Sequence, residues 1–467
     1  MAKIKKVHLL RIGFPNGKAC QAALKALGHD AYRYLSREDK LALLEQVLDN
    51  PQRYYDHPQL EATARAIQPE KGVDASWETP VLREKALPIR IFGEEHIEPG
   101  AVNQIYVAGK LPVARAAALM PDAHQGYGLP IGGVLATENA VIPYAVGVDI
   151  GCRMCLSMFE IPVSRIQQDH RQLKQLLMEH TTFGTGKGPE KPMDDPVLER
   201  EEFATISTVK NLKDKAWKQI GSSGSGNHFV EFGEVQLTDP DNEWDLPTGQ
   251  YLGLLSHSGS RGLGAGIAQH YTRLAKSRTR LPGEAAHLAW LSMDSEEGQE
   301  YWLAMNLAGD YASACHHHIH HRISRALGEK PAAVVENHHN FAWKEQLSTG
   351  EAVIVHRKGA TPAGKGVLGI IPGSMTAPGF IVRGKGISEA INSASHGAGR
   401  VMSRSKAKRS ITGHDLRKHL RDHKVTLIGG DLDEAPMAYK DISKVMASQQ
   451  SLVDVLGRFQ PKIVRMA

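Results

Sequence analysis

The first part of the chain has the apolar spacing of helices. Between residues 18 and 67 the apolar side chains recur with helical periodicity and include a leucine stripe that contains Leu44. Proline and glycine then interrupt residues 68–80, which is a composition typical of a linker. We therefore predict a small, mainly helical N-terminal segment over residues 1–85 and one larger domain over residues 86–467.

The apolar pattern changes after about residue 85. Short β-prone runs are broken by glycine, proline and asparagine, and helical patterns cover residues 163–180 and 295–327. Strands and helices do not alternate regularly, so we do not predict a doubly wound parallel sheet. The pattern predicts an α+β fold in which flanking helices surround a mixed-sheet core, behind the helical N-terminal segment.

Composition disfavours a membrane protein and a disulfide-rich secreted protein, but it does not identify a binding partner. The chain has 467 residues, too many for one hydrophobic core, and a formal net charge of +5, too small to argue for a polyanionic partner. A basic run over residues 400–409 fits either RNA phosphates or a solvated surface. No apolar run has the length of a membrane span, and the four cysteines are no disulfide framework. We therefore expect a cytoplasmic protein with no membrane partner.

Histidine and glycine are the unusual components, with 23 and 45 residues. The glycines punctuate short apolar runs, which predicts tight turns around a crowded site. His396 is the clearest case, because it lies in the sequence SASHGAGR. Small neighbours leave an imidazole uncovered, and glycine lets the backbone approach a ligand closely. The pattern predicts that a ligand approaches His396.

A second group of polar side chains lies in similar glycine-rich or β-like contexts. One carboxylate, one thiol and three imidazoles from this group would suit Mn²⁺, Zn²⁺ or Co²⁺. Taken singly, each residue is as well explained as a capping or core residue, because most histidines bind no metal. Spacing leaves both interpretations open. The group consists of Asp122, His124, Asp149, Cys152, His228, His257 and His339.

Three further motifs give weaker indications. Cys152 and Cys155 form a C-x-x-C, but no second pair completes a zinc site. The histidine-rich residues 315–321 lie in a long helical pattern without the glutamate of a metalloprotease motif, so we interpret them as a solvated face. Residues 359–366 approach the P-loop pattern but lack its final hydroxyl side chain and the helix that should follow, which excludes a P-loop NTPase.

Nine motifs occur in the order found in the RtcB family of RNA-splicing and repair ligases, which the chain resembles from about residue 100 to residue 442. The first 85 residues match less well. A single motif of this length arises by chance far more easily than nine in order. The motifs are MPDAHQGYGLPIGG, VGVDIGC, GSGNHFVE, HSGSRGLG, HHNFA, HRKGAT, IIPGSM, SHGAGRVMSRS and EAPMAYKD.

The resemblance implies a particular reaction. Family members use Mn²⁺ to transfer GMP from GTP to a histidine, and then pass it to an RNA 3′-phosphate. An RNA 5′-hydroxyl end displaces the GMP and seals the strand, and a 2′,3′-cyclic phosphate end is first hydrolysed to the 3′-phosphate. His396 matches the guanylylated histidine. The resemblance further implies a setting in RNA repair or tRNA splicing and raises archease as an activating partner.

The resemblance also assigns residues to roles. Two Mn²⁺ ions are expected, and the residues that match their ligands are Asp149, Cys152, His228, His257 and His339. Glu231 is expected to accept hydrogen bonds from guanine, and Tyr439 to stack on the base. Arg261 and Arg400 lie in matching motifs and are assigned to phosphates. The residues that match nucleotide contacts are Asn227, Glu231, Asn340, Pro372, Gly373, Ser374, Met375, Gly397, Ala398, Gly399 and Tyr439.

Several positions depart from the family pattern. Gly379 replaces a serine that contacts the nucleotide, and Arg153 stands where glycine is usual. Pro362 replaces a common arginine. The family's final lysine, which contacts guanine, is absent from KIVRMA, so Arg465 is a candidate substitute. We therefore expect a divergent member with altered guanine selectivity or RNA-end preference.

Other functions stay open on the sequence. A metal-dependent phosphoesterase would use the same metal ligands without a covalent histidine, and its activity would survive a His396→Ala substitution. An enzyme that caps RNA 3′-phosphate ends with guanylate would need His396 but would seal poorly. A non-catalytic module that recognises RNA ends is disfavoured, because all five metal-ligand positions are intact.

Overall fold

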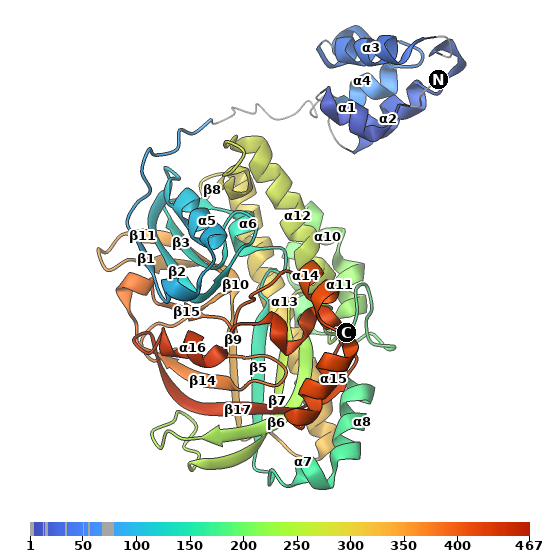
Figure 1. Ribbon diagram of the computed structural model, residues 1–467. Coiled ribbons are helices and arrows are strands. Elements are labelled where there is room, and N and C mark those ends of the chain that lie inside the picture. The colour runs from blue at the N-terminus through green and yellow to red at the C-terminus, as the bar shows by residue number, and fades with distance from the viewer. Residues whose placement is uncertain are drawn as a thin grey trace. The chain divides into compact units, whose positions relative to one another are not determined.

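The computed structural model describes residues 4–12, 14, 17–32, 35–49, 51–54, 57–67 and 79–467 (Figure 1). The chain divides into two compact units, Met1–Ser76 and Trp77–Ala467. Each unit has a hydrophobic core of its own.

The N-terminal unit is helical, as the sequence predicts. Leu9, Leu44 and Leu60 are fully buried in its core, and Leu41 packs against them, so the leucine stripe is the buried side of its helix. The helices are α1 (Lys6–Arg11), α2 (Lys18–Ala26), α3 (Arg37–Asp49) and α4 (Glu61–Ile67), with the short 3-10 helices η1 (Asp30–Tyr32) and η2 (Pro51–Tyr54).

The large unit is built around two sheets. The strands of the larger sheet are β5 (Arg153–Phe159), β6 (Phe229–Leu237), β7 (Gly249–Ser258), β9 (Ala333–His338), β13 (Leu368–Ile371), β14 (Gly379–Gly384), β16 (Thr426–Ile428) and β17 (Val453–Met466). Those of the smaller sheet are β1 (Ile89–Ile91), β2 (Ala114–His124), β3 (Ile131–Thr137), β10 (Asn340–Gln346) and β11 (Ala352–Lys358).

The strand order confirms the mixed-sheet α+β prediction. The larger sheet runs β13-β14-β17-β6-β7-β5-β9 with antiparallel pairs, and β16 adds a parallel pair to β17. The smaller sheet runs β1-β2-β3-β11-β10, with its one parallel pair between β1 and β2. Neighbours in both sheets are often distant in sequence, which brings scattered residues together.

The long helix α13 (Glu296–Leu327) lies against the larger sheet, as its contacts with β5 and β7 show (Figure 1). The Ser295 side chain caps the first turn by accepting a hydrogen bond from the Gly298 backbone N–H. Gly328 ends the helix in the left-handed conformation, with φ of 76°, which favours glycine. The predicted helix over residues 295–327 is therefore present with its expected boundaries.

The predicted helix over residues 163–180 is present in two pieces that break at Asp169. Within the described part of the chain, none of the helices combines the length and apolar character needed to cross a bilayer. The α-helices of the large unit are α5 (Pro99–Gly109), α6 (Pro143–Val146), α7 (Arg165–Gln168), α8 (His170–His180), α9 (Glu202–Thr205), α10 (Ser207–Lys210), α11 (Lys213–Gln219), α12 (Arg261–Arg278), α13, α14 (Arg404–Ser410), α15 (Gly413–Asp422) and α16 (Ile442–Ala447). Short elements are η3 (Glu94–His96), β4 (Ala140–Val141), η4 (Pro196–Glu199), η5 (Ala286–Leu288), β8 (Leu291–Ser292), β12 (Ala360–Pro362), η6 (Ser388–Ala390), β15 (Ser393–Ser395), η7 (Leu432–Glu434) and η8 (Pro436–Ala438).

Candidate active site

A cleft of about 930 Å³ is lined by strand ends from both main sheets. The larger sheet contributes the ends of β5, β6 and β7, and the smaller sheet contributes the ends of β3, β10 and β11. The lining includes the five predicted metal ligands, His396, Arg400 and every predicted nucleotide contact. Two candidate arginines, Arg261 and Arg465, lie outside it.

Neighbouring strands bring four of the predicted metal ligands together. Cys152 immediately precedes β5, His228 immediately precedes β6, His257 lies in β7, and His339 immediately follows β9. The strands β6, β7, β5 and β9 are adjacent in that order. Because paired strands lie about 4.8 Å apart, side chains from distant parts of the sequence reach one another at this sheet edge.

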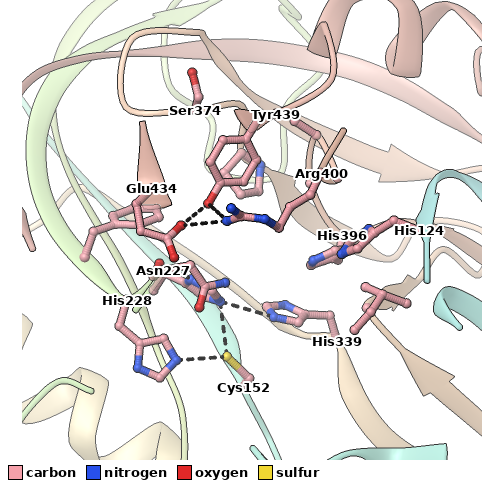
Figure 2. Close-up of a pocket in the computed structure, with 18 of the residues that line it drawn as sticks. His124, Cys152, Asn227, His228, His339, Ser374, His396, Arg400, Glu434 and Tyr439 are labelled. Carbon is pink, nitrogen blue, oxygen red and sulfur yellow. Dashed lines mark hydrogen bonds and ion pairs between the residues drawn. The ribbon is translucent and has the colours of Figure 1, made fainter. Parts of the chain in front are cut away.

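The sulfur and nitrogen atoms of these residues converge in the cleft, where Figure 2 shows Cys152, His228 and His339. The Cys152 Sγ lies 3.1 Å from the His257 Nε2 and 3.5 Å from the His228 Nε2. The His228 Nε2 lies 2.9 Å from an Asp149 carboxylate oxygen, and the His257 Nε2 lies 3.2 Å from the His339 Nε2. One thiol, one carboxylate and three imidazoles are a donor set that suits a divalent transition metal.

A backbone contact fixes the proton position on His257. The Nδ1 of His257 lies 3.0 Å from the carbonyl oxygen of Asn227, which can only accept, so Nδ1 carries the hydrogen. The lone pair is therefore on Nε2, the atom that faces Cys152 and His339. A second partner that orients an imidazole in this way is typical of histidines that bind metals.

Burial sets the protonation of the predicted ligands. It lowers the pKa of His257 to about 3 and the pKa of His339 well below its usual value, so both imidazoles are neutral near pH 7. Burial, together with the Asp149 carboxylate, raises the pKa of the Cys152 thiol well above its usual value. A divalent cation is the group that would stabilise the thiolate here, because it supplies the opposing charge.

The imidazole of His396 is oriented by a buried carboxylate that the sequence did not assign to the site. His396 follows β15, and its Nδ1 lies 2.6 Å from the Asp122 Oδ2, which also accepts from the His396 backbone N–H at 3.1 Å. Burial would raise the pKa of Asp122, but the neighbouring His396 holds that pKa below its usual value. The carboxylate is therefore ionised and accepts the Nδ1 hydrogen, so that in the neutral imidazole the lone pair lies on Nε2.

The glycines beside His396 have a structural reason. Gly399 has a φ of 72°, and a Cβ at this position would lie 2.0 Å from the carbonyl oxygen of Asp122. Only glycine allows this close approach of the two chain segments. The sequence SHGAGR therefore reflects the contact that brings Asp122 to His396. The ring centroids of His396 and His339 are 5.0 Å apart, so His396 lies beside the predicted metal ligands.

The predicted guanine contact lies in an apolar part of the cleft. Glu231 on β6 is 3% exposed, and burial raises the pKa of its carboxyl well above the usual value. Phe229, Leu255 and Met466 line the same cleft. A carboxyl group in such surroundings gains most from a ligand that donates hydrogen bonds to it.

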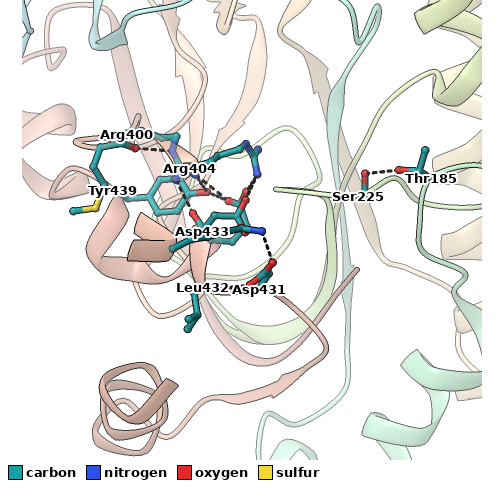
Figure 3. A network of polar contacts seen from close by, with 11 residues as sticks. Thr185, Ser225, Arg400, Arg404, Asp431, Leu432, Asp433 and Tyr439 are labelled. Atoms are coloured by element: carbon teal, nitrogen blue, oxygen red, sulfur yellow. Dashed lines mark hydrogen bonds and ion pairs between the residues drawn. The ribbon is translucent and has the colours of Figure 1, made fainter. Parts of the chain in front are cut away.

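Arg400 and Tyr439 are joined by a polar network at the cleft (Figures 2 and 3). The Arg400 guanidinium lies 5.1 Å from the ring centroid of Tyr439 and donates to the Asp433 carbonyl oxygen at 2.6 Å. Glu434 accepts from the Tyr439 hydroxyl and from Arg400. Glu434 was not predicted as a site residue, although it begins the EAPMAYKD motif. The network holds the Tyr439 ring and the Arg400 charge in place.

Two predicted arginines are held outside the cleft lining. Arg261 donates to the carbonyl oxygen of Gly184 at 2.7 Å and to the Ser222 hydroxyl at 3.1 Å. Arg465, on β17, lies over the ring of Phe183 and donates to a backbone carbonyl of α8. Each guanidinium is thus occupied by the protein itself. Neither side chain belongs to the cleft lining, but Arg261 is close enough to interact electrostatically with the Asp149 carboxylate.

The other departures from the family pattern have separate environments. Arg153 forms an ion pair of 3.0 Å with Glu336, and Pro362 lies in β12. Gly379 lines the cleft, and a Cβ there would make its closest contact at 3.4 Å, with the Pro372 Cα. A Cβ therefore fits at Gly379 in ordinary van der Waals contact.

The histidine-rich stretch of α13 corrects the prediction of a solvated face. His317 and His321 are exposed as predicted, but His316 and His320 are buried. The error arose because residues 316 and 317 belong to different sides of one helix. His316 and His320 share the side of Ala312, Ile319 and Ile323, which packs into the protein.

The two buried histidines of α13 lie near Cys155, on the sheet face opposite the cleft. Their ligand atoms and the Cys155 sulfur lie within 4.8 Å of one another. All four imidazole nitrogens nevertheless have partners. The His316 Nε2 donates to the Ser258 carbonyl oxygen at 3.2 Å, and its Nδ1 accepts from the Ser256 hydroxyl at 2.6 Å.

The same chain of hydrogen bonds continues through His320. Its Nε2 donates to the Ser256 oxygen at 2.8 Å, and its Nδ1 accepts from the Ser157 hydroxyl at 2.7 Å. Burial lowers the pKa of His316 well below its usual value and that of His320 to about 3, so both are neutral. We interpret this group as a satisfied polar network within the core.

Comparison with known proteins places the large unit among described families. The family model "tRNA-splicing ligase RtcB" matches residues 104–467. "RNA-splicing ligase RtcB" of Escherichia coli (strain K12) is 34% identical over 389 residues, which cover 77% of this chain and 92% of that protein. "tRNA-splicing ligase RtcB" of Thermococcus kodakarensis is 29% identical, over 85% of this chain and 98% of that protein. "RNA-splicing ligase RtcB" of Mycobacterium tuberculosis is 31% identical, over 74% and 96%.

Proposed function

The chain belongs to the RtcB family, and we propose that it is an RNA ligase that uses GTP to join an RNA 3′-phosphate, or 2′,3′-cyclic phosphate, to an RNA 5′-hydroxyl end. The observation that carries the proposal is the contact of 2.6 Å between the His396 Nδ1 and Asp122. It leaves His396 with a lone pair on Nε2, in a cleft that also holds a candidate metal centre. A phosphoesterase without a covalent histidine would not need this imidazole as a nucleophile.

The first step is the attack of His396 on GTP. The Nε2 lone pair forms a bond to the α-phosphorus, the bond from that phosphorus to the bridging oxygen breaks, and pyrophosphate leaves. Asp122 stabilises the positive charge that develops on the imidazole, because its carboxylate accepts the Nδ1 hydrogen. The product is a phosphoramidate whose GMP group is readily transferred.

The residues that would hold Mn²⁺ are Asp149, Cys152, His228, His257 and His339, which we propose as the ligands of two ions. Bound metal would neutralise phosphate charge and polarise phosphorus–oxygen bonds. The protein prepares this by burying neutral imidazoles and by fixing the tautomer of His257 through the Asn227 carbonyl oxygen.

The remainder of the cleft would hold the nucleotide. Glu231 would accept from the N1 and N2 hydrogens of guanine, which adenine cannot offer in that pattern. The held ring of Tyr439 would stack on the base. We propose that Asn227, Asn340 and the segments Pro372–Met375 and Gly397–Gly399, which line the cleft, contact the nucleotide. Arg400 lines the cleft and would face a phosphate, whereas Arg261 would act only by supporting the loop that it binds.

The later steps use the RNA ends. An oxygen of the RNA 3′-phosphate attacks the phosphorus of the His396 adduct, and the nitrogen–phosphorus bond breaks. The 5′-hydroxyl then attacks the RNA 3′-phosphorus and GMP leaves, so that one phosphodiester is formed per GTP.

The state of the cysteines supports the predicted reducing, cytoplasmic setting. The four thiols are buried and belong to Cys20, Cys152, Cys155 and Cys315.

A ligation assay with defined ends tests the proposal. The wild-type protein is incubated with GTP, MnCl₂ and two RNAs, one with a 3′-phosphate or 2′,3′-cyclic phosphate and one with a 5′-hydroxyl. Sealing by the wild type and none by His396→Ala is the expected result. RNA 3′-ends that gain guanylate without sealing would instead identify a capping enzyme. Hydrolysis that survives in His396→Ala would identify a phosphoesterase. Addition of archease shows whether an activating partner is required.

A further inference from the structure

A group of aromatic side chains lines the cleft and has no place in the reaction described above. Tyr127 and Tyr144 both belong to the cleft lining, and Tyr127 is 68% exposed. Val148, which is 43% exposed, also lines this region and precedes the predicted metal ligand Asp149. Exposed apolar and aromatic side chains next to a reaction centre point to a ligand that covers them.

The aromatic rings support one another. The rings of Tyr144 and His287 are stacked, with centroids 5.0 Å apart and an angle of 25° between their planes. The ring of Tyr127 lies 5.9 Å from His287 and 6.5 Å from Tyr144, and it is tilted against both. Tyr127 is therefore the outer member of a three-ring cluster, and its exposed side remains open to a further ring.

The backbone under this cluster is held firmly. The buried ammonium group of Lys358 donates to the carbonyl oxygens of Tyr127 and Tyr144, at 2.6 and 3.2 Å, and lies 5.0 Å from the Tyr144 ring centroid. Gly128 has a φ of 71°, and a Cβ there would lie 3.0 Å from the Cβ of His287. One lysine and one glycine thus fix the loop of Tyr127 against the other two rings.

The cluster shares its chain segments with the reaction centre. Tyr127 lies shortly after Asp122, which orients His396, and Tyr144 lies shortly before Asp149. Gly359, next to Lys358, is close enough to His396 that a Cβ there would lie 3.2 Å from its Cε1. A group that stacks on the cleft side of Tyr127 would therefore lie in the same cleft as His396 and the predicted metal ligands.

Two lysines lie behind the cluster and serve to hold it in place. The Lys276 ammonium group lies 3.0 Å from the His287 Nδ1, and Lys358, whose pKa burial lowers to about 7, lies beneath Tyr144. The feature that points to RNA is therefore the exposed ring, because aromatic side chains are the surfaces on which single-stranded bases stack.

We propose that Tyr127, supported by Tyr144 and His287, is a stacking platform for the terminal nucleobase of an RNA end that is being joined. The inference rests on the proposed function for the identity of the ligand as RNA. The base belongs either to the 3′-phosphate end or to the 5′-hydroxyl end, because both must approach His396 and the metal centre. Stacking on a ring accepts any base, so the platform would bind the end of the strand without reading its sequence.

Two variants of Tyr127 and a matched control test this proposal. Tyr127→Ala removes the ring and Tyr127→Phe keeps it, while Tyr106→Ala removes a tyrosine that is 43% exposed on α5 and lies outside the cleft lining. Thermal unfolding establishes that each variant is folded. Binding is measured by fluorescence anisotropy with MnCl₂ and without GTP. The probes are labelled single-stranded RNAs that carry a 3′-phosphate or a 5′-hydroxyl and whose terminal nucleotide has its base or is abasic.

The expected result separates the two ends. Tyr127→Ala should weaken binding of one of the two RNA ends by about tenfold, within the range of about 5- to 150-fold that loss of one base–aromatic contact produces. Tyr127→Phe and Tyr106→Ala should bind as the wild type does. An abasic terminal nucleotide should cause the same loss in the wild type and no further loss in Tyr127→Ala.

Other outcomes would overturn the platform. Unchanged binding of both ends by Tyr127→Ala would do so, as would a loss that persists equally with abasic RNA. A raised KM for GTP in the guanylylation of His396 would assign the ring to the nucleotide instead. The test is separate from the proposed function: absence of guanylylation in the wild type would contradict the ligase, whereas the RNA-binding comparison would still decide on Tyr127.

Discussion

The two faces of the larger sheet carry similar buried residues in different bonding states. On the cleft face, the His257 lone pair is directed at Cys152 and His339, because its other nitrogen donates to a carbonyl oxygen. On the face covered by α13, both nitrogens of His316 and of His320 have hydrogen-bond partners. Residue types are therefore a poor guide to a metal site. What matters is whether the ligand atoms are already used within the chain.

The buried carboxylates of the two faces also differ in whether they have partners within the chain. Glu336, which contacts α13, is paired with Arg153 and His317; burial opposes ionisation there, but the pairing with His317 lowers its pKa below the usual value. Glu231, on the cleft face, is buried and its pKa is raised by that burial. The polar groups on the face covered by α13 are satisfied without a ligand. The cleft face retains buried polar groups that a ligand would stabilise.

Substitution of the cysteine on the cleft face is expected to have the largest effect, with the cysteine on the other face as its control. Cys152→Ala should abolish tight Mn²⁺ binding and reduce guanylylation by at least about 100-fold, since the loss of groups that merely support a ligand costs about 10- to 100-fold. Cys155→Ala, the matched control, should bind Mn²⁺ and react as the wild type does. Metal content after gel filtration and the rate of GMP transfer measure both. Loss of Mn²⁺ in Cys155→Ala alone would reverse the assignment of the two faces.

The unpaired carboxyl of the cleft face predicts a pH dependence. Guanine needs an ionised Glu231 as acceptor, and burial raises the pKa of this group, so GTP affinity should increase as pH rises through its ionisation. Glu231→Gln should remove this slope and weaken GTP binding by about 10- to 150-fold, as expected for loss of hydrogen bonds to a charged group. Equilibrium binding of GTP from about pH 5 to about pH 9 measures both effects, because this range lies above the ordinary carboxyl pKa and covers raised values. A slope that persists in Glu231→Gln would assign the titration to another group.

The network under α13 predicts a change in stability without a change in chemistry. Ser256→Ala removes the hydroxyl that links His316 to His320 and leaves buried nitrogens without partners. The free energy of unfolding should fall by about 1–3 kcal/mol. Denaturant unfolding measures this loss, and the Mn²⁺ content should not change. A fall in Mn²⁺ content as large as that in Cys152→Ala would show that the two faces are not independent.

The smallest expected effect comes from restoring a polar group to the cleft. Gly379→Ser fits sterically, because the closest Cβ contact would be 3.4 Å. One hydrogen bond contributes about 0.5–1.5 kcal/mol, so the KM for GTP should fall by about 2- to 10-fold. Steady-state guanylylation measures it, with Gly379→Ala as the control for size. An equal fall in both variants would attribute the effect to packing rather than to the hydroxyl.

The sequence predicted which segments form helices and strands better than it predicted which of these elements lie next to one another. Helical periodicity located α13, and irregular alternation indicated a mixed sheet. The convergence of Cys152, His228 and His257 could not be derived from spacing, because it depends on which strands are neighbours in the sheet. The candidate ligands were instead assigned through ordered motifs. Asp122 was noted but not assigned, since its partner His396 is 274 residues away.

The direction of side chains was the hardest feature to predict. From their positions in the sequence, Arg261 was assigned to phosphates and Arg465 was considered for guanine. Both guanidinium groups contact backbone carbonyls outside the cleft lining, and their roles stay predictions. On α13, the spacing alone allowed either His316 with His320 or His317 with His321 to be the buried pair. Burial of Ala312, Ile319 and Ile323 would have favoured His316 and His320, but only packing against the sheet decides between the pairs.

The most direct measurement is the location of the GMP adduct. The wild-type protein is incubated with α-labelled GTP and MnCl₂ without RNA, and the labelled peptide is identified by tandem mass spectrometry. Our account predicts a single adduct on His396 that is lost in acid and stable in base, as expected of a histidine phosphoramidate. The adduct should be absent from His396→Ala. A label on another residue, or no label on a folded protein with bound Mn²⁺, would contradict the account.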